Sequence, residues 1–298
     1  MKKNSDKLFA AIEAGGTKFV IAIGNTNEIK RKISISTRDP DTTWRDALGF
    51  LKQTYSEMPF SAIAMASFGP LDLNEKSQNY GRLTNTPKAG WQDAHMLAPL
   101  RSFNLPIALE TDVSAAALGE AMLGQGRDKN TVAYVTVGTG IGAGIVRDGQ
   151  ILNGATHPEI GHIPLPQDIN SDPFPGICPF HKNCLEGLAS GKAIHARWSS
   201  NLNDLEQDHP AYAIQAQYLG YLCSVLMLCF SPDKILLGGG VMQSKSLLEK
   251  SRDSCFNYLN GYPKKESLEQ IIERPAHEGT SALIGGFILA DRLMKSTR

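Results

Sequence analysis

Two stretches of the chain share one pattern of hydrophobic and polar positions. Each has a short apolar run, a turn rich in glycine and threonine, and a second apolar run; the turns are GGTK (15–18) and GTGIG (138–142). The apolar runs contain many β-branched residues, which favours strands. Two strands joined by a tight glycine turn predict a β-hairpin. We therefore expect two hairpins of the same layout, as equivalent parts of two lobes.

The remaining apolar runs alternate between strand-like and helix-like lengths. Further strands are expected at 62–67, 107–110 and 235–237. Helices are expected near 42–56, 114–123, 187–199, 210–230 and 281–293, with one more beginning near 244. Residues 164–184 are rich in proline and lack a sustained period, so they predict an irregular loop. Alternating strands and helices indicate an α/β fold.

The glycine turns are typical of phosphate-binding loops, because backbone N–H groups in such turns can face an anion. Neither turn is a Walker A loop, which reads G-x-x-x-x-G-K-[ST] and opens a helix. The second turn fits G-x-G-x-x-A through Gly138, Gly140 and Ala143, but a strand follows where a dinucleotide-binding fingerprint requires a helix. An ordinary hairpin without a ligand is the alternative for both turns.

Composition excludes several classes of protein. The 298 residues carry a formal net charge of zero, so neither a nucleic acid nor a membrane surface is expected as a partner. The N-terminus lacks the apolar region of a signal peptide, and the longest apolar run, 218–230, is too short to span a bilayer. The five cysteines fit a reducing compartment better than a disulfide framework. We expect a cytoplasmic protein.

Three possible metal ligands occur at regular spacing in the irregular loop. Cys178, His181 and Cys184 are separated by two residues each, which is typical of zinc sites; chance occurrence is the alternative. With a fourth nitrogen or sulfur ligand the site would be a closed tetrahedron, and therefore structural rather than catalytic. The nearby HPEIGH (157–162) does not fit the H-E-x-x-H helix of metalloproteases, because proline and glycine disfavour a helix interior.

Eight segments, in this order and spacing, resemble the ROK family within the sugar kinase, actin and Hsp70 superfamily, and are most similar to its bacterial fructokinases. They are EAGGTKF (13–19), SFGPLD (67–72), TNTPKAGW (84–91), TDVSAAALGEA (111–121), TVGTGIGAG (136–144), HPEIGH (157–162), CPFHKNCLEG (178–187) and ILLGGGVM (235–242). The resemblance covers essentially the whole chain. It implies a two-lobed, actin-like ATPase (ribonuclease H-like) α/β fold with a cleft between the lobes. The small domain would be residues 1–114 plus 282–298, and the large domain 115–281 with the zinc-binding loop.

The resemblance also assigns roles to individual residues. Asp112 would be the catalytic base that accepts the proton of the attacking sugar hydroxyl; a simple N-cap is the alternative. The sugar would be bound by Gly69, Asn85, Thr86, Asp112, Glu159, His162 and Glu186. The nucleotide would be bound by Gly15, Gly16, Thr17, Lys18, Thr136, Gly138, Thr139, Gly140, Lys192, Gly239 and Gly240. The metal ligands would be His162, Cys178, His181 and Cys184.

The implied activity is transfer of the γ-phosphate of ATP to D-fructose, giving fructose 6-phosphate. Mg²⁺ would neutralise the ATP phosphates, and a structural Zn²⁺ would hold the loop. A kinase for another hexose (mannose, glucose or an N-acetylhexosamine) is the alternative. A non-catalytic, sugar-sensing regulator is a remote one, because such relatives carry a helix-turn-helix ahead of the first hairpin and only seven residues precede Leu8. Family analogy implies a homodimer.

Overall fold

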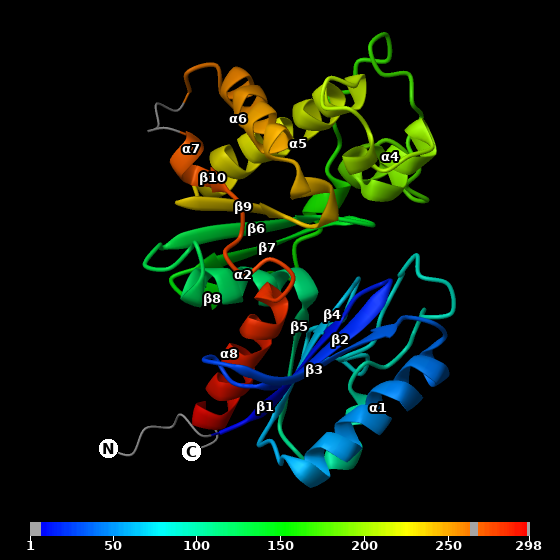
Figure 1. Ribbon diagram of the computed structural model, residues 1–298, viewed down its shortest axis with the longest axis vertical. Helices are drawn as coiled ribbons and strands as arrows, with labels where there is room; N and C mark the ends of the chain where they lie inside the picture. The colour runs from blue at the N-terminus through cyan, green and yellow to red at the C-terminus, as the bar shows by residue number, and fades with distance from the viewer. Residues whose placement is uncertain (1–6, 263–267, 297–298) are drawn as a thin grey trace. The chain divides into compact units, whose positions relative to one another are not determined.

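The computed structural model describes residues 7–262 and 268–296, which form two compact units. The first unit contains the chain up to Gly119, then Leu152–His157, and the chain from Thr280 onward. The second contains Glu120–Ile151 and Pro158–Gly279. Each unit has its own sheet and its own hydrophobic core (Figure 1).

The first unit is built on a mixed sheet with the strand order β3-β2-β1-β4-β5. Its strands are β1 (Phe9–Ala14), β2 (Lys18–Gly24), β3 (Ile29–Ser36), β4 (Ile63–Ser67) and β5 (Ile107–Thr111). Strands β1 and β2 are antiparallel, which confirms the first predicted hairpin, whereas β1, β4 and β5 run parallel. The edge strand β3 was not expected, because its sequence IKRKISIS is largely exposed and offers few apolar residues.

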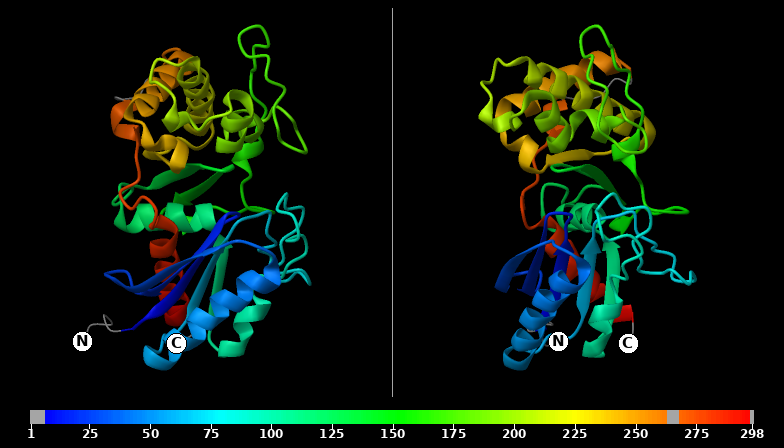
Figure 2. Two further views of the ribbon diagram at one scale, coloured as in Figure 1. Left: turned by 45° about the vertical axis from the view of Figure 1, so that its right-hand side comes forward. Right: turned by 90° about the vertical axis from the view of Figure 1, so that its right-hand side faces the viewer.

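Helices cover both faces of this sheet (Figures 1 and 2). Helix α1 (Pro40–Glu57) packs Trp44 and Leu51 into the core on one face, and begins where the Asp39 side chain accepts the N–H of Thr42. Helix α8 (Ser281–Ser296) covers the other face with Phe287. The chain also forms η1 (Ala98–Phe103), a short 3-10 helix, and α2 (Asp112–Leu123), which follows β5 directly.

The second unit has a sheet with the strand order β10-β9-β6-β7-β8. Its strands are β6 (Thr131–Val137), β7 (Ile141–Arg147), β8 (Gln150–Ile151), β9 (Lys234–Gly238) and β10 (Ile272–Glu273). Strands β6 and β7 are antiparallel and pair Val137 with Ile141, which confirms the second predicted hairpin. Strand β9 runs parallel to β6 and ends beside it.

The helices of the second unit pack on this sheet through one large core. They are α3 (Leu185–Ala189), α4 (Gly191–Trp198), α5 (Pro210–Phe230), α6 (Lys245–Leu259) and α7 (Leu268–Ile271), with the 3-10 turns η2 (Ile160–His162), η3 (Leu202–Asp204) and η4 (Gly240–Gln243). The single helix expected over 187–199 is wrong. It is broken at Ser190, whose backbone is extended (φ −70°, ψ 161°) and whose side chain accepts the N–H of Ala193 to begin α4.

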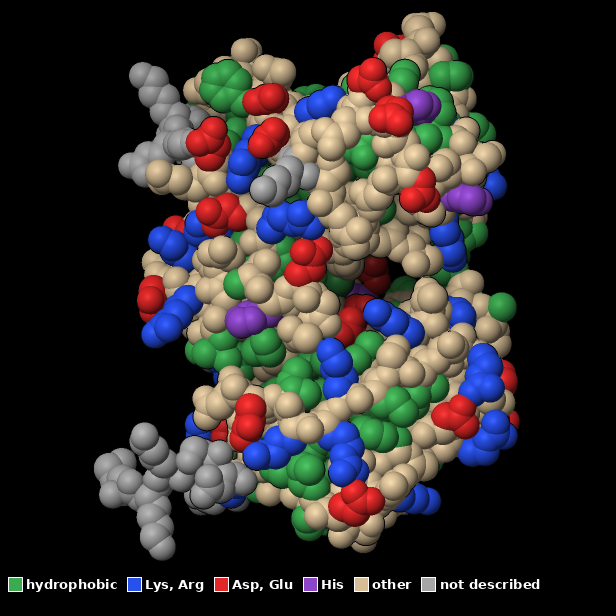
Figure 3. All heavy atoms as spheres, in the orientation of Figure 1, with side chains coloured by type: hydrophobic (Ala, Val, Ile, Leu, Met, Phe, Trp, Pro, Cys, Tyr) green, Lys and Arg blue, Asp and Glu red, His purple; other side chains and the backbone are tan. Residues whose placement is uncertain are grey.

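Helix α5 contains the apolar run expected to be too short for a bilayer, but the helix itself has 21 residues. Among the described residues, α5 is the one helix long and apolar enough to cross a membrane. However, 56% of its most apolar window is buried inside the structure, as in a core helix of a globular unit. Residues 164–184 are irregular as predicted, with isolated bridges only. Acidic and basic side chains are interspersed over the face seen in Figure 3, in keeping with the zero net charge.

Candidate functional site

The first glycine turn is held by its own backbone and by the segment after β3. The N–H of Gly15 donates to the carbonyl of Lys18 at 2.9 Å, and the hydroxyl of Thr37 donates to the carbonyl of Gly15 at 2.7 Å. Thr17 and Lys18 are exposed, and a Cβ placed on Gly16 would meet no atom within 4 Å. These hydrogen bonds thus fix the backbone of the turn, while the space next to Gly16 stays open for a ligand.

Asp112 is the first residue of α2 and follows β5 directly. Its carboxylate accepts the N–H of Val113 at 2.9 Å, whereas the hydroxyl of Thr111 accepts the N–H of Ser114 at 3.1 Å. Thr111 therefore caps the helix, and the N-cap alternative for Asp112 is wrong. Burial raises the pKa of Asp112 to about 6, so the group is still ionised at neutral pH and can accept a proton.

Two more carboxyl groups lie near the carboxyl ends of the parallel strands β1 and β5, close to where β5 leads into Asp112. Burial, and then the charge of Asp112, raise the pKa of Glu13 in β1 to about 7. Burial also raises the pKa of Glu110 in β5, whose carboxylate accepts a hydrogen bond from Asn153 at 2.8 Å. Strands β1 and β5 both flank β4, with Glu13 and Glu110 at the same level. The cluster concentrates buried negative charge at the carboxyl end of the sheet, where α/β folds bind ligands.

The sugar candidates of the first unit lie on its loops. Asn85 is exposed, and the hydroxyl of Thr86 accepts the N–H of Lys88 at 3.3 Å. Gly69 lies against His157, whose Cε1 would be 3.3 Å from a Cβ at that position. His157 is buried, and its Nε2 accepts the N–H of Leu71 at 3.1 Å. Sequence analysis assigned no role to His157. Its position in the HPEIGH motif was the only feature that could have indicated that it supports the loop of Gly69 and Leu71.

The second glycine turn is closed by its own backbone and contacted by two other segments of its unit. The N–H of Gly138 donates to the carbonyl of Gly140 at 2.9 Å, which closes the turn. The N–H of Gly191 donates to the carbonyl of Gly138 at 2.7 Å, and Oε2 of Glu186 accepts the N–H of Ile141 at 2.9 Å. Lys192, the residue after Gly191, is exposed at the start of α4. Five of the proposed ligand-binding positions thus lie on this turn or on segments bonded to it: Gly138, Thr139, Gly140, Glu186 and Lys192.

The glycines after β9 lie beside the same turn. Gly239 has a φ of +94°, and a Cβ there would lie 2.5 Å from the carbonyl oxygen of Val137, so a side chain is excluded on both counts. The carbonyl of Gly240 accepts a hydrogen bond from Asn203 at 2.8 Å. Thr136 is paired with Gly238 across β6 and β9. The proposed nucleotide-binding residues of the second unit therefore gather at the carboxyl ends of β6 and β9.

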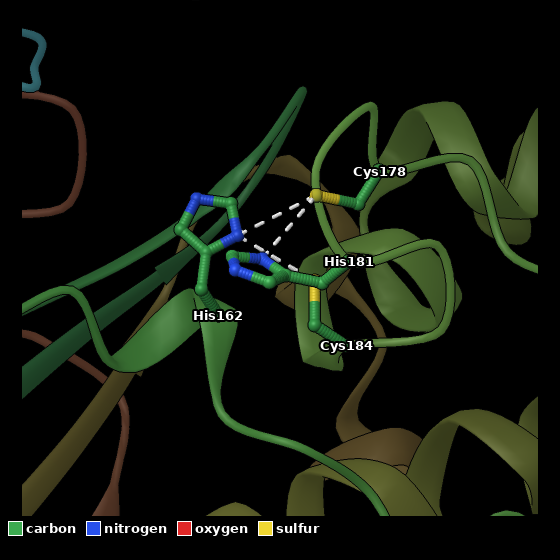
Figure 4. Close-up of side chains that lie close together, drawn as sticks. All are labelled: His162, Cys178, His181 and Cys184. Carbon is green, nitrogen blue, oxygen red and sulfur yellow. Dashed lines mark hydrogen bonds between the residues drawn. The ribbon is translucent and has the colours of Figure 1, made fainter. Parts of the chain in front are cut away.

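Four side chains from two segments, η2 and the loop over 178–184, point toward one another in the second unit (Figure 4). They are His162, Cys178, His181 and Cys184, and their nitrogen and sulfur atoms lie within 4.8 Å of one another. Nδ1 of His162 is 3.7 Å from Sγ of Cys178 and 3.5 Å from Sγ of Cys184. Sγ of Cys178 is 3.8 Å from Nδ1 of His181. The four residues could hold one metal ion.

Other parts of the HPEIGH motif differ in environment. His162 belongs to η2, a single 3-10 turn, so the motif does not form the helix that a metalloprotease requires. Glu159 is exposed just before that turn. His157 and Glu159 fall in different units of the chain, so the motif contributes side chains to both.

The ROK family model matches residues 9–293. The chain belongs to the ROK family. Among ROK relatives, a fructokinase from Pediococcus pentosaceus is 40% identical over 97% of this chain and 99% of its own length. A fructokinase from Zymomonas mobilis subsp. mobilis is 39% identical over 97% of this chain and 98% of its own. A solved ROK hexokinase from Thermus thermophilus is 25% identical and superposes with a TM-score of 0.78 over 97% of this chain and 99% of that chain.

This likeness confirms the expected α/β fold of ROK sugar kinases, which is of the actin-like ATPase type. The predicted roles of individual residues stay predictions. Within each unit, however, the residues that the ROK resemblance selects lie at strand ends, on turns and loops, and in the first turns of helices.

Proposed function

We propose that this chain is a fructokinase that transfers the γ-phosphate of ATP to D-fructose and gives fructose 6-phosphate and ADP. The observation that carries the proposal is the 39–40% identity to fructokinases over nearly the full length of both chains. The carboxylate of Asp112, directly after β5, would supply the base that this reaction uses.

The proton of the attacking hydroxyl goes to Asp112. As the sugar oxygen bonds to the γ-phosphorus, the bond from that phosphorus to the β,γ-bridging oxygen breaks and ADP leaves. The base contributes less to phosphoryl transfer than positioning and charge neutralisation do. A pKa of about 6 leaves Asp112 ionised at neutral pH, while burial keeps bulk water away from the group that receives the proton.

The nucleotide is assigned to the two glycine turns and the strand ends beside them. Open space above Gly16 and Gly138, where a Cβ would meet nothing within 4 Å, supports close approach of a phosphate to both backbones. Mg²⁺ is expected with ATP, where it neutralises the phosphate charge. The assigned residues are Gly15, Gly16, Thr17, Lys18, Thr136, Gly138, Thr139, Gly140, Lys192, Gly239 and Gly240.

The sugar is assigned to polar side chains and one glycine, because buried hydroxyls need hydrogen-bond partners. These are Gly69, Asn85, Thr86, Asp112, Glu159, His162 and Glu186. A kinase for mannose, glucose or an N-acetylhexosamine would use the same machinery and is the alternative. A non-catalytic regulator is remote, because Asp112 and both glycine turns are retained.

The four-residue cluster fits zinc. A tetrahedron with zinc–nitrogen and zinc–sulfur bonds of about 2.0–2.3 Å has ligand–ligand separations of about 3.3–3.8 Å. The Cys–His separations of 3.5, 3.7 and 3.8 Å in the structure fall in that range. Two imidazoles and two thiols fill all four positions, so zinc here would be structural: it would cross-link the irregular loop and supply no chemistry to the substrate.

The family resemblance also predicts a homodimer that works in carbohydrate metabolism in the cytoplasm. These two expectations bear on assembly and location rather than on the reaction. Gel filtration with light scattering measures the first, and fractionation of the native cell measures the second.

The deciding experiment is a coupled ADP-release assay with Mg-ATP and, in turn, fructose, mannose, glucose and N-acetylglucosamine. We expect the highest kcat/KM with fructose and a product identified as fructose 6-phosphate. Asp112→Asn is the matched control for contaminating kinases and should lose turnover with every sugar. A higher kcat/KM for another hexose would replace fructose as the substrate, and no turnover with any sugar would support the regulator.

A further inference from the structure

The second glycine turn is clamped by the same two segments that carry metal ligands. On one side, α3 approaches through Glu186, whose Oε2 accepts the N–H of Ile141 at 2.9 Å. On the other, η2 approaches so closely that a Cβ on Gly161 would lie 2.0 Å from the carbonyl oxygen of Ile141. The residue that begins β7 therefore has its N–H held by α3 and its carbonyl crowded by η2.

The metal ligands are direct neighbours of these contacts in sequence. His162 follows Gly161, and Cys184 is the N-cap of α3, two residues before Glu186. Sγ of Cys184 lies 3.5 Å from Nδ1 of His162. A metal ion shared by these two ligands would thus fasten η2 to the start of α3, and the position of Glu186 depends on that start.

The start of α3 packs Leu185 in the core, but the loop before it adds few contacts. The N–H of Leu185 donates to the carbonyl of Ile163 at 3.0 Å, but the apolar side chains of Ile169, Ile177 and Phe180 are exposed rather than packed. Helix α3 has five residues, too few to be stable without tertiary support. Leu185 and Leu188 supply part of that support by packing in the core, and four ligands on one ion would fix the start of the helix itself.

We propose that Glu186 is a positioning residue that couples the four-ligand metal site to the second glycine turn. With the metal bound, α3 is fixed, the Glu186 carboxylate stays on the N–H of Ile141, and the turn keeps the conformation in which its backbone faces a phosphate. Without the metal, α3 loosens and the turn loses this hydrogen bond. The link to phosphate rests on the proposed function, whereas the coupling itself is a property of the second unit.

The coupling can be measured without substrate. Amide hydrogen exchange is resolved to single residues by NMR on the full chain, once loaded with zinc and once stripped with a chelator. In the wild type, we expect exchange of the Ile141 amide to accelerate about tenfold on zinc removal, the effect of losing one hydrogen bond to a charged acceptor. The amides of Ile235 and Leu237, in the centre of β9, serve as internal references and should stay unchanged.

Two substitutions at one position separate coupling from general loosening. Glu186→Ala should show the fast Ile141 exchange already with zinc bound, and should respond less than about twofold to its removal. Glu186→Gln keeps a side-chain oxygen that can accept the same N–H, so it should restore most of the protection and its zinc dependence. Zinc content is measured in each variant, because all three proteins must bind it for the comparison to hold.

Binding of a non-hydrolysable ATP analogue by calorimetry gives a second readout. Zinc removal should weaken binding about tenfold in the wild type and hardly at all in Glu186→Ala. Unchanged Ile141 exchange in stripped wild type overturns the proposal, as does a Glu186→Ala protein that responds like the wild type. If the exchange pattern appears but no sugar is phosphorylated, the coupling stands and the proposed function fails.

Discussion

The carboxyl groups of Glu13 and Asp112 interact electrostatically within the first unit, Glu13 near the end of β1 and Asp112 directly after β5. Both are half-buried, and the charge on Asp112 adds to burial in raising the pKa of Glu13 from 4.5 to about 7. Burial raises the pKa of Asp112 from 3.8 to about 6. The proposed base and its acidic neighbour are thus held in a place that disfavours their charged forms, and a cost in stability follows.

The pH dependence of stability should reveal this cost. Because both folded pKa values are raised, the folded state binds more protons than the unfolded state between about pH 4 and 7, and stability falls as pH rises through that window. Glu13→Gln and Asp112→Asn should each be more stable than the wild type at pH 8, on the order of 1–3 kcal/mol. The gain should vanish near pH 4.

Urea denaturation at pH 4, 6 and 8 measures these differences. Glu57→Gln is the matched control, because hydrogen bonds from Arg31 and Gln53 lower the pKa of that exposed carboxyl group. The control should show no gain at pH 8. If the free energy of unfolding of Glu13→Gln equals that of the wild type at every pH, burial does not destabilise the charged forms of these carboxyl groups.

Asp112→Asn should lose turnover by at least about 10²-fold, because an amide of the same size cannot accept the proton. The helix should keep its start, since Thr111 rather than Asp112 caps α2. Calorimetry should therefore find nucleotide binding close to that of the wild type. Asp128→Asn is the control: Asp128 has a φ of 62°, a conformation that asparagine tolerates, and its turnover should be unchanged. Turnover of Asp112→Asn within about threefold of wild type would remove it as the base.

Both hairpins and most helices were predictable because their signals are local. A β-branched run on each side of a glycine turn predicts a hairpin. Strands β1 and β2, and strands β6 and β7, pair in this way. Edge elements were missed for a physical reason. Strand β3 presents polar side chains to water, and β10 has two residues that gain their order from pairing with β9.

The contacts that build the candidate site could not be predicted in the same way. The hydrogen bond from Ile141 to Glu186 joins residues 45 positions apart, and that from Leu71 to His157 joins residues 86 apart. No periodicity encodes such pairs, because they arise from tertiary packing. The candidate metal cluster was the exception. Three of its residues are separated by only two positions each in the sequence, and the family resemblance predicted His162 as the fourth.

The glycine turns should tolerate a methyl group in the free protein but not with nucleotide bound. Gly16 and Gly138 have no positive φ, and a Cβ on either meets no atom within 4 Å. Gly16→Ala and Gly138→Ala should thus keep the free energy of unfolding within about 1 kcal/mol of wild type. If phosphates approach these backbones closely, the KM for ATP should rise about tenfold or more, because the methyl group displaces a hydrogen-bonded anion.

Steady-state kinetics with ATP and fructose varied in turn test this prediction. The KM for fructose should change much less than the KM for ATP. Gly154→Ala, at an exposed loop glycine whose Cβ would have the carbonyl of Thr156 as its nearest neighbour at 3.9 Å, is the control. An unchanged KM for ATP in both hairpin variants would refute phosphate binding by these turns.

The protein should contain about one zinc ion per chain when purified without chelator. Cys184→Ser should lose it, because a serine hydroxyl is a poor zinc ligand, and the loop over 163–184 should become sensitive to protease. Cys229→Ser is the matched control, since Cys229 is an exposed cysteine on α5, and it should keep both zinc and protease resistance. Elemental analysis measures the metal; a zinc content near zero in the wild type would exclude the structural site.

The middle of the irregular loop (164–184) is anchored by a buried charge pair that should contribute much more to the free energy of unfolding than a surface ion pair does. Asp172 is 4% exposed, and its Oδ2 accepts hydrogen bonds from Nη2 of Arg197, at 2.9 Å, and from the hydroxyl of Tyr218. Burial, and then Asp172, raise the pKa of Tyr218, so its hydroxyl stays a donor. The guanidinium of Arg197 also lies 4.5 Å from the centre of the Phe174 ring.

Asp172→Ala should lower the free energy of unfolding by about 3–5 kcal/mol, because it leaves the Arg197 charge buried without its partner. The double variant Asp172→Ala with Arg197→Met should recover part of that loss, since no unpaired charge then remains. Asp168→Ala, an exposed carboxylate in the same loop, should cost at most about 1 kcal/mol. Urea denaturation of the zinc-loaded proteins measures all three. Equal losses in Asp172→Ala and the double variant would mean that lost packing, not an unpaired charge, dominates at this anchor.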